Sequence, residues 1–213
     1  MKQFFLITLI ALFSSLFAND VQIVSKYDQT TSFSADFTQF FTSKISKKVS
    51  GKEAGHLFYL APTFIRFDYM TGKKLSRQTF VNETDITIVN HDKKSAMMQS
   101  KKGDLSQYLI FLKGTAEIKK TFLVSESDPQ KAASTGIKIE KNQKIFKLKP
   151  LQNIQGVTYI FLIIEKEEVK SVVIIDELSN INQIIFSSVK INEPTNKNIF
   201  TPNIPKNYSI SKF

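Results

Sequence analysis

The sequence has no cysteine and no tryptophan, and only two histidines, seven glycines and six prolines in 213 residues. Without cysteine the chain can form neither disulfides nor thiolate metal sites, and it offers no thiol nucleophile. It also has no cysteine that could carry a lipid, so it is not itself a lipoprotein. The signatures HExxH and GxSxG, the P-loop and the Rossmann glycine pattern are absent as well. These absences predict that the protein is not an enzyme, and they indicate no cofactor and no metal site.

The two histidines, His56 and His91, stand apart from each other in strand-like sequence. A lone histidine in a strand is more often structural or exposed than catalytic. The acidic run Glu165–Glu168 is typical of a solvated turn rather than of a metal site. No residue therefore stands out as a catalyst.

Long apolar runs are scarce, and the longest lies at the N-terminus. The run Phe4–Phe17 follows Lys2 and precedes the small residue Ala18. Its length of about 14 residues is short of the roughly 20 that a membrane-spanning helix needs. The pattern is that of a secretory signal peptide, and a membrane anchor is the alternative. We expect a cleaved signal peptide over residues 1–18 and one exported domain over residues 19–213.

Basic residues outnumber acidic ones, 29 to 19, for a formal net charge of +10. Such a chain could meet anionic lipid head groups, acidic proteins or nucleic acid. The lysines gather in expected turns, such as Lys73–Lys74 and Lys93–Lys94, while the aromatics alternate within expected strands. Nucleic-acid binding needs a basic face interleaved with stacking aromatics. We therefore expect no nucleic-acid partner and interpret the lysines as solvated loops.

Alternation of apolar and polar residues predicts a large antiparallel sheet. In residues 64–69, Ile65, Phe67 and Tyr69 fall on one face, whereas Arg66 and Asp68 fall on the other and are expected to face solvent. One face of the strand over residues 32–41 comprises Phe33, Ala35, Phe37, Gln39 and Phe41.

Further patterns extend this sheet toward the C-terminus. We expect two strands within residues 76–98, followed by strands at 137–140, 145–150, 157–165, 171–176 and 181–192. The last stretch, residues 196–210 with two prolines, predicts an ordered but irregular ending.

Helical spacing occurs in two places. Ile23 and Tyr27 form a short apolar stripe near the N-terminus. In the middle of the chain the same spacing is found for Leu105, Tyr108, Leu109 and Leu112, and Gly114 is expected to end that helix. A sheet with so few helices leaves part of one face uncovered.

Nineteen phenylalanines, a few of them in the expected signal peptide, supply much of the apolar surface. Any single phenylalanine is explained by core packing. Together they also fit a concave apolar cleft, and such clefts bind acyl chains because each buried CH₂ contributes roughly 0.8 kcal/mol.

An ordered set of segments carries a family resemblance. It comprises SFSADFTQ at 32–39, FYLAPTFIRFDY at 58–69, SQYLIFLKG at 106–114, FKLKP at 146–150 and FSSVKINEPTNKNIFTPNIPKNY at 186–208. Together these segments resemble the periplasmic outer-membrane lipoprotein carrier proteins, the LolA family. The resemblance implies a mainly β fold, an open antiparallel half-barrel made of one large curved sheet, with a short N-terminal helix and central lid helices.

The resemblance also implies a function and partners. Family members act as periplasmic chaperones that accept lipoproteins from an inner-membrane ABC transporter, shield the acyl chains and deliver them to the outer membrane. The expected partners are lipoproteins, that transporter and an outer-membrane receptor where one exists. We expect a monomer.

Carried over to this sequence, the resemblance assigns two groups of side chains that contact acyl chains. The lid side chains are Ile23, Tyr27, Leu105, Tyr108, Leu109 and Leu112. The acyl-chain-binding cleft is lined by Phe33, Ala35, Phe37, Leu57, Tyr59, Ile65, Phe67 and Tyr69.

The sequence departs from the family at Ala61-Pro62, where the family has Arg-Pro. The family's arginine ties the lid to the barrel, which an alanine cannot do. Either lid closure is weaker here or another group holds the lid. Arg66 is a candidate only if Pro62 breaks the strand's alternation. The family's tryptophans are replaced by Phe67 and by Ile86 or a neighbour.

Three functions compete at this point. A carrier fits a chain in which the strand patterns run almost to the end. A periplasmic sensor of lipid or lipoprotein on the same fold is the alternative, and it is expected to bring a second domain for its partner. A lipid-processing enzyme lacks a catalytic set.

Overall fold

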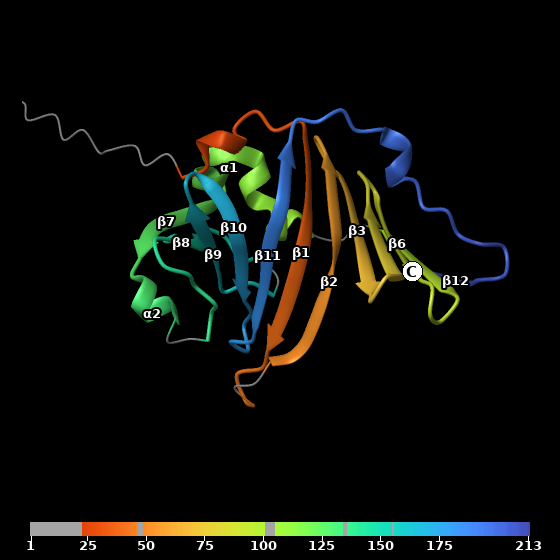
Figure 1. Cartoon of the computed structure of the whole chain (residues 1–213), viewed down its shortest axis with the longest axis horizontal. Coiled ribbons are helices and arrows are strands. Elements are labelled where there is room, and N and C mark those ends of the chain that lie inside the picture. The colour runs from red at the N-terminus through yellow and green to blue at the C-terminus, as the bar shows by residue number, and fades with distance from the viewer. Residues whose placement is uncertain (1–22, 47–48, 101–104, 134–135, 155) are drawn as a thin grey trace, which may run out of the picture.

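The computed structural model describes residues 23–46, 49–100, 105–133, 136–154 and 156–213. The expected signal peptide, residues 1–18, lies outside this part. The described residues form one sheet of twelve strands in the order β12-β6-β5-β4-β3-β2-β1-β11-β10-β9-β8-β7 (Figure 1). The strands are β1 (Ser32–Thr42), β2 (Val49–Leu60), β3 (Phe64–Thr71), β4 (Lys74–Val81), β5 (Asp85–Asn90), β6 (Ser95–Ser100), β7 (Phe122–Ser127), β8 (Lys144–Pro150), β9 (Tyr159–Glu165), β10 (Glu168–Ile175), β11 (Ile181–Ile191) and β12 (Ser209–Lys212).

Neighbouring strands are antiparallel except β12, which pairs with β6 in parallel. The sheet curves and stays open, with β7 and β12 at its two edges. The helical segments are η1 (Ser25–Tyr27), η2 (Leu105–Lys113), α1 (Gly114–Thr121), α2 (Pro129–Ala133) and η3 (Lys197–Phe200). This architecture confirms the predicted fold class of a mainly β, open antiparallel sheet with few helices.

Several details correct the sequence interpretation. Residues 74–100 form three strands, β4 to β6, rather than two, and residues 137–140 form no strand. The ending expected to be irregular contains η3 and β12. Gly114, with φ +81°, ends η2 as expected, but a second helix that was not predicted, α1, begins at Gly114 and runs for eight residues.

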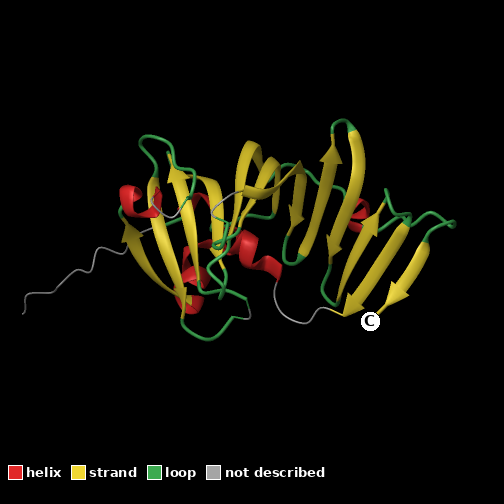
Figure 2. Ribbon diagram, turned by 90° about the horizontal axis from the view of Figure 1, so that it is seen from below, coloured by secondary structure: helices red, strands yellow, loops and turns green. Residues whose placement is uncertain are grey.

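We call η1, η2 and α1 together the lid, and the face of the sheet that they cover the concave face. Figure 2 shows these helices gathered against the half of the sheet that contains β7 to β11. The side chains of the lid and of the concave face form one apolar cluster, to which both halves of the sheet contribute. The rest of the concave face, over β2 to β5, has no helix on it in this view.

The outer face is covered at both ends by other segments. Ala132 of α2 and Ile137 pack on outward side chains of β8 to β11, including Phe161 and Ile163. Strand β9 is therefore buried on both faces, which explains its unbroken apolar run. At the other end, Ile204 and Tyr208 of the C-terminal segment pack on Phe80, Val89 and Ala96.

This C-terminal covering overturns the expectation that Arg66 and Asp68 face solvent. Their side chains are only 22% and 10% exposed, and two hydrogen bonds of 2.8 and 2.6 Å join them. Asp68 also accepts from Gln78 Nε2 at 2.7 Å. Arg66 Nη1 donates to the carbonyl oxygen of Ile199 at 3.0 Å, so the pair fastens η3 to the sheet. Sequence alternation indicated the correct face, but it could not reveal that the chain returns to cover it.

Candidate ligand-binding cleft

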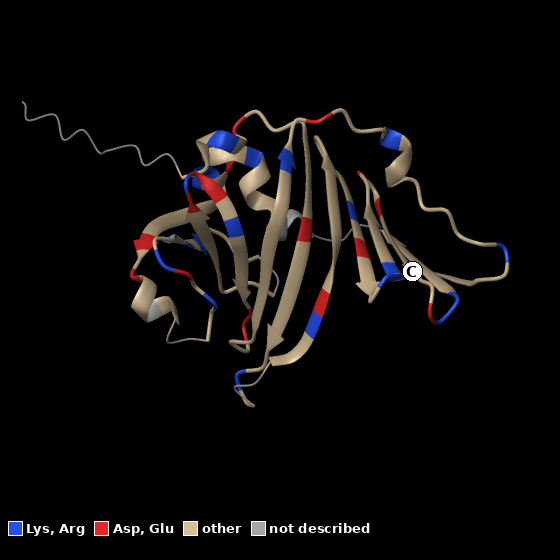
Figure 3. Ribbon diagram, in the orientation of Figure 1, with Lys and Arg blue, Asp and Glu red and all other residues tan. Residues whose placement is uncertain are grey.

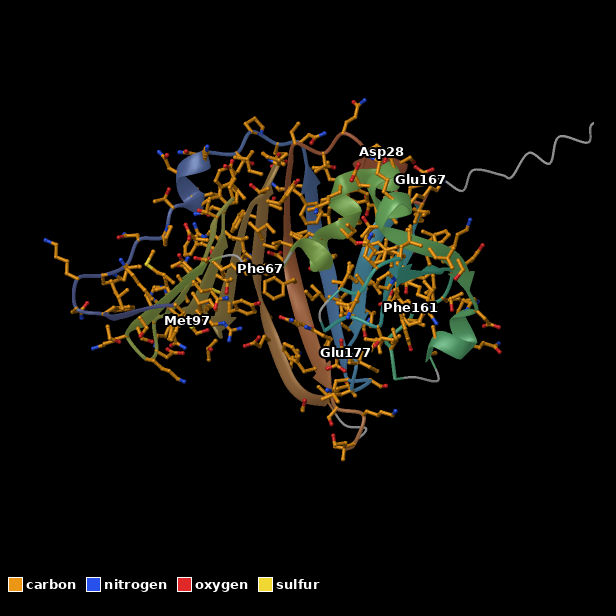
Figure 4. All side chains as sticks on the ribbon, turned by 180° about the vertical axis from the view of Figure 1, so that it is seen from behind. Asp28, Phe67, Met97, Phe161, Glu167 and Glu177 are labelled. Carbon is orange, nitrogen blue, oxygen red and sulfur yellow. The ribbon has the colours of Figure 1, made fainter. Side chains whose placement is uncertain are left out.

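The predicted cleft residues lie together on the concave face. Cross-strand pairing aligns Leu57 with Phe67 and Tyr59 with Ile65, so alternate residues of β2 and β3 share that face. All the predicted cleft residues belong to the apolar cluster. Tyr69 is partly buried, and the others are buried: Phe33, Ala35, Phe37, Leu57, Tyr59, Ile65 and Phe67. Figure 4 shows Phe67 near the middle of the sheet, on the side from which the lid is seen in front of the strands.

Four of the predicted lid residues belong to the same cluster: Ile23, Tyr27, Leu109 and Leu112. The other two, Leu105 and Tyr108, are part of η2, but their side chains lie outside the described part. Helical spacing missed Ile110, Phe111 and Ile118, which are 4%, 0% and 0% exposed. The continuous LIFL run was the signal for the first two, because a helix that is apolar all round is buried all round.

Aromatic contacts seal the part of the concave face beneath the lid. Phe111 of η2 meets Tyr27 edge-on with ring centroids 4.9 Å apart, and Phe33 at 5.6 Å. Phe33 in turn contacts Phe186 of β11 at 5.9 Å. Edge-to-face packing of this kind stabilises by about 0.5–1.5 kcal/mol per pair beyond area burial. Beneath the lid, Phe33 is therefore part of the core.

Beyond the lid the concave face is hollow. Phe37 contacts Phe67 and Tyr69, with centroids 5.6 and 5.3 Å apart. A pocket of about 200 Å³ opens beside them, lined by Gln39, Phe41, Ile65, Phe67, Tyr69, Thr79, Val81, Asn182 and Ile184. The face that alternation predicted is thus sealed core at one end and pocket at the other. We call the pocket of about 200 Å³ the cleft pocket.

Six lining residues of the cleft pocket were not predicted as site residues. Gln39 and Phe41 share the alternation of Phe37, so the sequence did place them on this face. Pairing between strands places the lining residues of β4 and β11 beside this face. Val81 lies opposite Ile65, and Ile184 lies opposite Gln39. Because this pairing joins residues far apart in sequence, alternation within one strand could not find them.

Polar groups border the cleft pocket on the side away from the lid. Gln39 Nε2 donates to Asn182 Oδ1 at 2.9 Å. Arg77 lies over the ring of Tyr69, 3.9 Å from its centroid, and Nη2 reaches both carboxylate oxygens of Glu53 at 2.9 and 2.8 Å. The border is therefore polar but locally neutralised. On the opposite, outer face of the sheet, acidic and basic residues are also interspersed (Figure 3).

A second hollow, of about 560 Å³, adjoins the cleft pocket at the ends of β1 and β11. The two spaces share Phe41 and Asn182 in their linings. The remaining lining is mostly polar: Thr42, Ser43, Ser50, Gly156, Ile174, Asp176, Asn180 and Ile181. An apolar pocket thus leads into a more polar mouth, the arrangement that suits an amphiphile.

The lid is held by groups other than residue 61. Asp28 Oδ1 accepts from the backbone N–H of Thr115 in α1 at 2.7 Å, and the N–H of Val24 donates to Thr115 Oγ1 at 3.3 Å. These bonds join η1 to α1. Ala61 packs against the apolar cluster, and its N–H donates to the Thr31 carbonyl at 2.8 Å, a contact with the backbone alone.

Strand β10 anchors the lid a second time. The N–H of Val169 donates to Tyr27 Oη at 3.0 Å, and burial raises the pKa of this phenol to about 12. Lys26 pairs with Glu168 at 2.5 Å. Hydrogen bonds from Lys170 and then from Lys26 lower the pKa of the Glu168 carboxyl to about 2. Because this carboxylate is ionised at neutral pH, the anchor is in place there.

No helix in the described part of the chain is long and apolar enough to cross a membrane. Among curated proteins, no sequence matches the chain significantly. Solved structures do match. An uncharacterized conserved protein from Thermus thermophilus superposes with a TM-score of 0.53 at 11% identity, covering 89% of this chain and 94% of that chain. At this identity the match shows a shared fold.

Two other structural matches have lower TM-scores. A LolA superfamily protein from Nitrosomonas europaea gives 0.46 at 10% identity, covering 85% of this chain and 98% of that chain. A chain of the MucA/MucB complex of Pseudomonas aeruginosa gives 0.41 at 9% identity, covering 84% and 58%. The sequence itself matches the family described as outer membrane lipoprotein carrier protein LolA over residues 28–203. Since this match spans most of the chain, the protein belongs to the LolA family.

Proposed function

We propose that this protein is a periplasmic chaperone that binds lipoprotein acyl chains in the cleft pocket and carries them from the inner to the outer membrane. The observation that supports this most is the mainly apolar cleft pocket beside the lid, on the family's sheet. The proposal includes a cleaved signal peptide over residues 1–18, an inner-membrane ABC transporter as the donor of cargo, and no enzymatic activity.

The dimensions of the cleft pocket describe a closed state. Its volume of about 200 Å³ is below the roughly 300–1,000 Å³ typical of sites for small ligands. Acyl chains would therefore enter by displacing apolar lid side chains from the concave face. The segment Leu109–Leu112 is the part to move, because it begins at the kink at Leu109 and covers the sheet next to the cleft pocket.

The free energies of this exchange suit a carrier. Burying a 16-carbon chain contributes up to about 12 kcal/mol. Exposing the four apolar side chains of Leu109–Leu112 costs about 6–12 kcal/mol on the same scale. Because the two terms are of similar size, cargo would bind without becoming trapped.

A pocket-filling variant tests the proposal. Thr79 lines the cleft pocket, and a phenylalanine there would occupy much of it. Thr38, on the outward side of β1, provides the matched control Thr38→Phe. Spheroplasts that make a labelled outer-membrane lipoprotein are incubated with purified protein of residues 19–213. We expect soluble lipoprotein to co-elute with the native protein and with Thr38→Phe, but not with Thr79→Phe.

Two results would each contradict a part of this proposal, the first the carrier function and the second the cleft pocket as the binding site. Fatty acid binding without any release of lipoprotein would favour a lipid sensor on this fold. Equal release by Thr79→Phe and Thr38→Phe would show that the cargo lies elsewhere. Thermal unfolding of both variants checks that they are folded.

A further inference from the structure

Gln39 carries a buried oxygen that the fold does not use. The residue is 5% exposed and lines the cleft pocket. Its Nε2 donates to Asn182, but within the described part of the chain Oε1 has no hydrogen-bond partner. Buried side-chain oxygens almost always have a partner, so each exception calls for an explanation.

The surroundings of this oxygen indicate where its partner would come from. Next to Gln39 on β1, Phe37 is sealed among aromatic rings and Phe41 separates the cleft pocket from the polar mouth. Gln39 thus lies near the boundary between apolar and polar linings. An acyl chain in the cleft pocket would bring its linkage group, the first polar group of the molecule, to this boundary.

We propose that Gln39 Oε1 accepts a hydrogen bond from a donor at the linkage end of a bound acyl chain. This inference rests on the proposed function and adds a ligand class to it. A carbonyl oxygen can only accept, so the ligand must carry an N–H or O–H group. An amide-linked chain supplies an N–H, and a hydroxyl beside an ester supplies an O–H, whereas a simple alkyl ester supplies neither.

The consequence is selectivity among acyl compounds. A site with a buried group to satisfy discriminates strongly against an analogue that leaves the group unpaired. Gln39 would therefore favour chains with a donor at their linkage, while the apolar lining accepts any chain.

The test compares ligands that differ in the linkage. Binding of N-methylpalmitamide, monopalmitoylglycerol and methyl palmitate is measured by displacement of a fluorescent fatty acid from the protein of residues 19–213. The variant Gln39→Met keeps the length and removes the acceptor, and Thr38→Val on the opposite face is the control. We expect the ratio of amide affinity to methyl ester affinity to fall about 5- to 10-fold in Gln39→Met and to stay constant in Thr38→Val.

The three ligands distinguish an amide N–H donor from a hydroxyl donor. They also distinguish a failure of the role of Gln39 from a failure of the carrier proposal. A falling ratio for the amide supports an amide-linked chain, and a falling ratio for the monoglyceride supports a hydroxyl donor. If both ratios are unchanged in folded Gln39→Met while all three ligands bind, the role of Gln39 is wrong and the carrier proposal stands. If no ligand binds the native protein, both proposals are wrong.

Discussion

The phenol oxygen of Tyr27 accepts a hydrogen bond from the backbone N–H of Val169 at 3.0 Å, across 142 residues of sequence. Val169 lies at a register shift in the pairing of β10 with β9. Tyr27 is fully buried among the rings of Phe33 and Phe111. One side chain thus links the lid, the concave face and β10.

Changing Tyr27 to Phe would remove this hydrogen bond and leave the Val169 N–H unpaired. We expect the free energy of unfolding to fall by about 1–3 kcal/mol, as measured by urea denaturation. Tyr59→Phe is the control, because its hydroxyl makes only a 3.3 Å bond to the Pro62 carbonyl and should cost less. A Tyr27→Phe protein as stable as the native one would show that this hydrogen bond does not hold the lid to β10.

Gly114 is the joint between η2 and α1, and it should not tolerate a side chain. Its φ is +81°, and a Cβ there would lie 2.8 Å from Asp28 Oδ1 and 3.0 Å from Asp28 Cα. Gly114→Ala would strain the backbone and would also displace Asp28. We expect the free energy of unfolding to fall by about 2–4 kcal/mol. Gly72→Ala, at φ +62° with open space around it, would lose only the roughly 1–2 kcal/mol of strain. Equal losses in the two variants, measured by urea denaturation, would contradict the role of Asp28 as a lid anchor.

The ion pairs of Glu168 predict a dependence of stability on pH. Because its pKa is lowered from 4.5 to about 2 on folding, the carboxylate stabilises the protein fully above pH 4.5. This contribution is lost as the pH falls toward 2. The side chain is 32% exposed, so solvent screening keeps the contribution below about 1 kcal/mol.

Glu168→Gln should therefore be slightly less stable than the native protein at pH 7, with the difference shrinking between pH 4.5 and 2. Urea denaturation across this pH range checks the expectation. A constant difference from pH 7 to pH 2 would contradict it.

The pair of Arg66 and Asp68 predicts how the C-terminal segment is held. Asp68→Asn would leave the partly buried guanidinium of Arg66 without its anion. We expect the free energy of unfolding to fall by about 2–4 kcal/mol. Backbone amides of residues 197–213 should then exchange hydrogen faster, because Arg66 binds the Ile199 carbonyl.

An exposed pair on the same face of the sheet gives the comparison. Asp36 contacts His56 at 2.6 Å with side chains 47% and 50% exposed. Asp36→Asn should cost less than about 1 kcal/mol and leave the C-terminal segment unchanged. If Asp68→Asn and Asp36→Asn lower the free energy of unfolding equally, covering by the C-terminal segment does not strengthen the pair of Arg66 and Asp68.

Local alternation in the sequence was enough to assign the faces of the strands. In residues 64–69 it put Ile65, Phe67 and Tyr69 on the concave side and Arg66 and Asp68 on the other, as the structure has them. It did so because successive side chains of a strand point to opposite faces, a rule that needs only neighbouring residues. The continuous apolar run of β9 likewise matches burial on both faces.

What covers each face became known only from the three-dimensional arrangement. The burial of Arg66 and Asp68 depends on η3, more than 120 residues further along the chain. The lid anchors join η1 to α1 and β10, and the unpaired oxygen of Gln39 depends on the register of β1 with β11. Each of these contacts pairs groups distant in sequence, and no local periodicity encodes which distant segment arrives. Alternation therefore predicts that a face is apolar, while long-range packing decides whether that face becomes core or cleft.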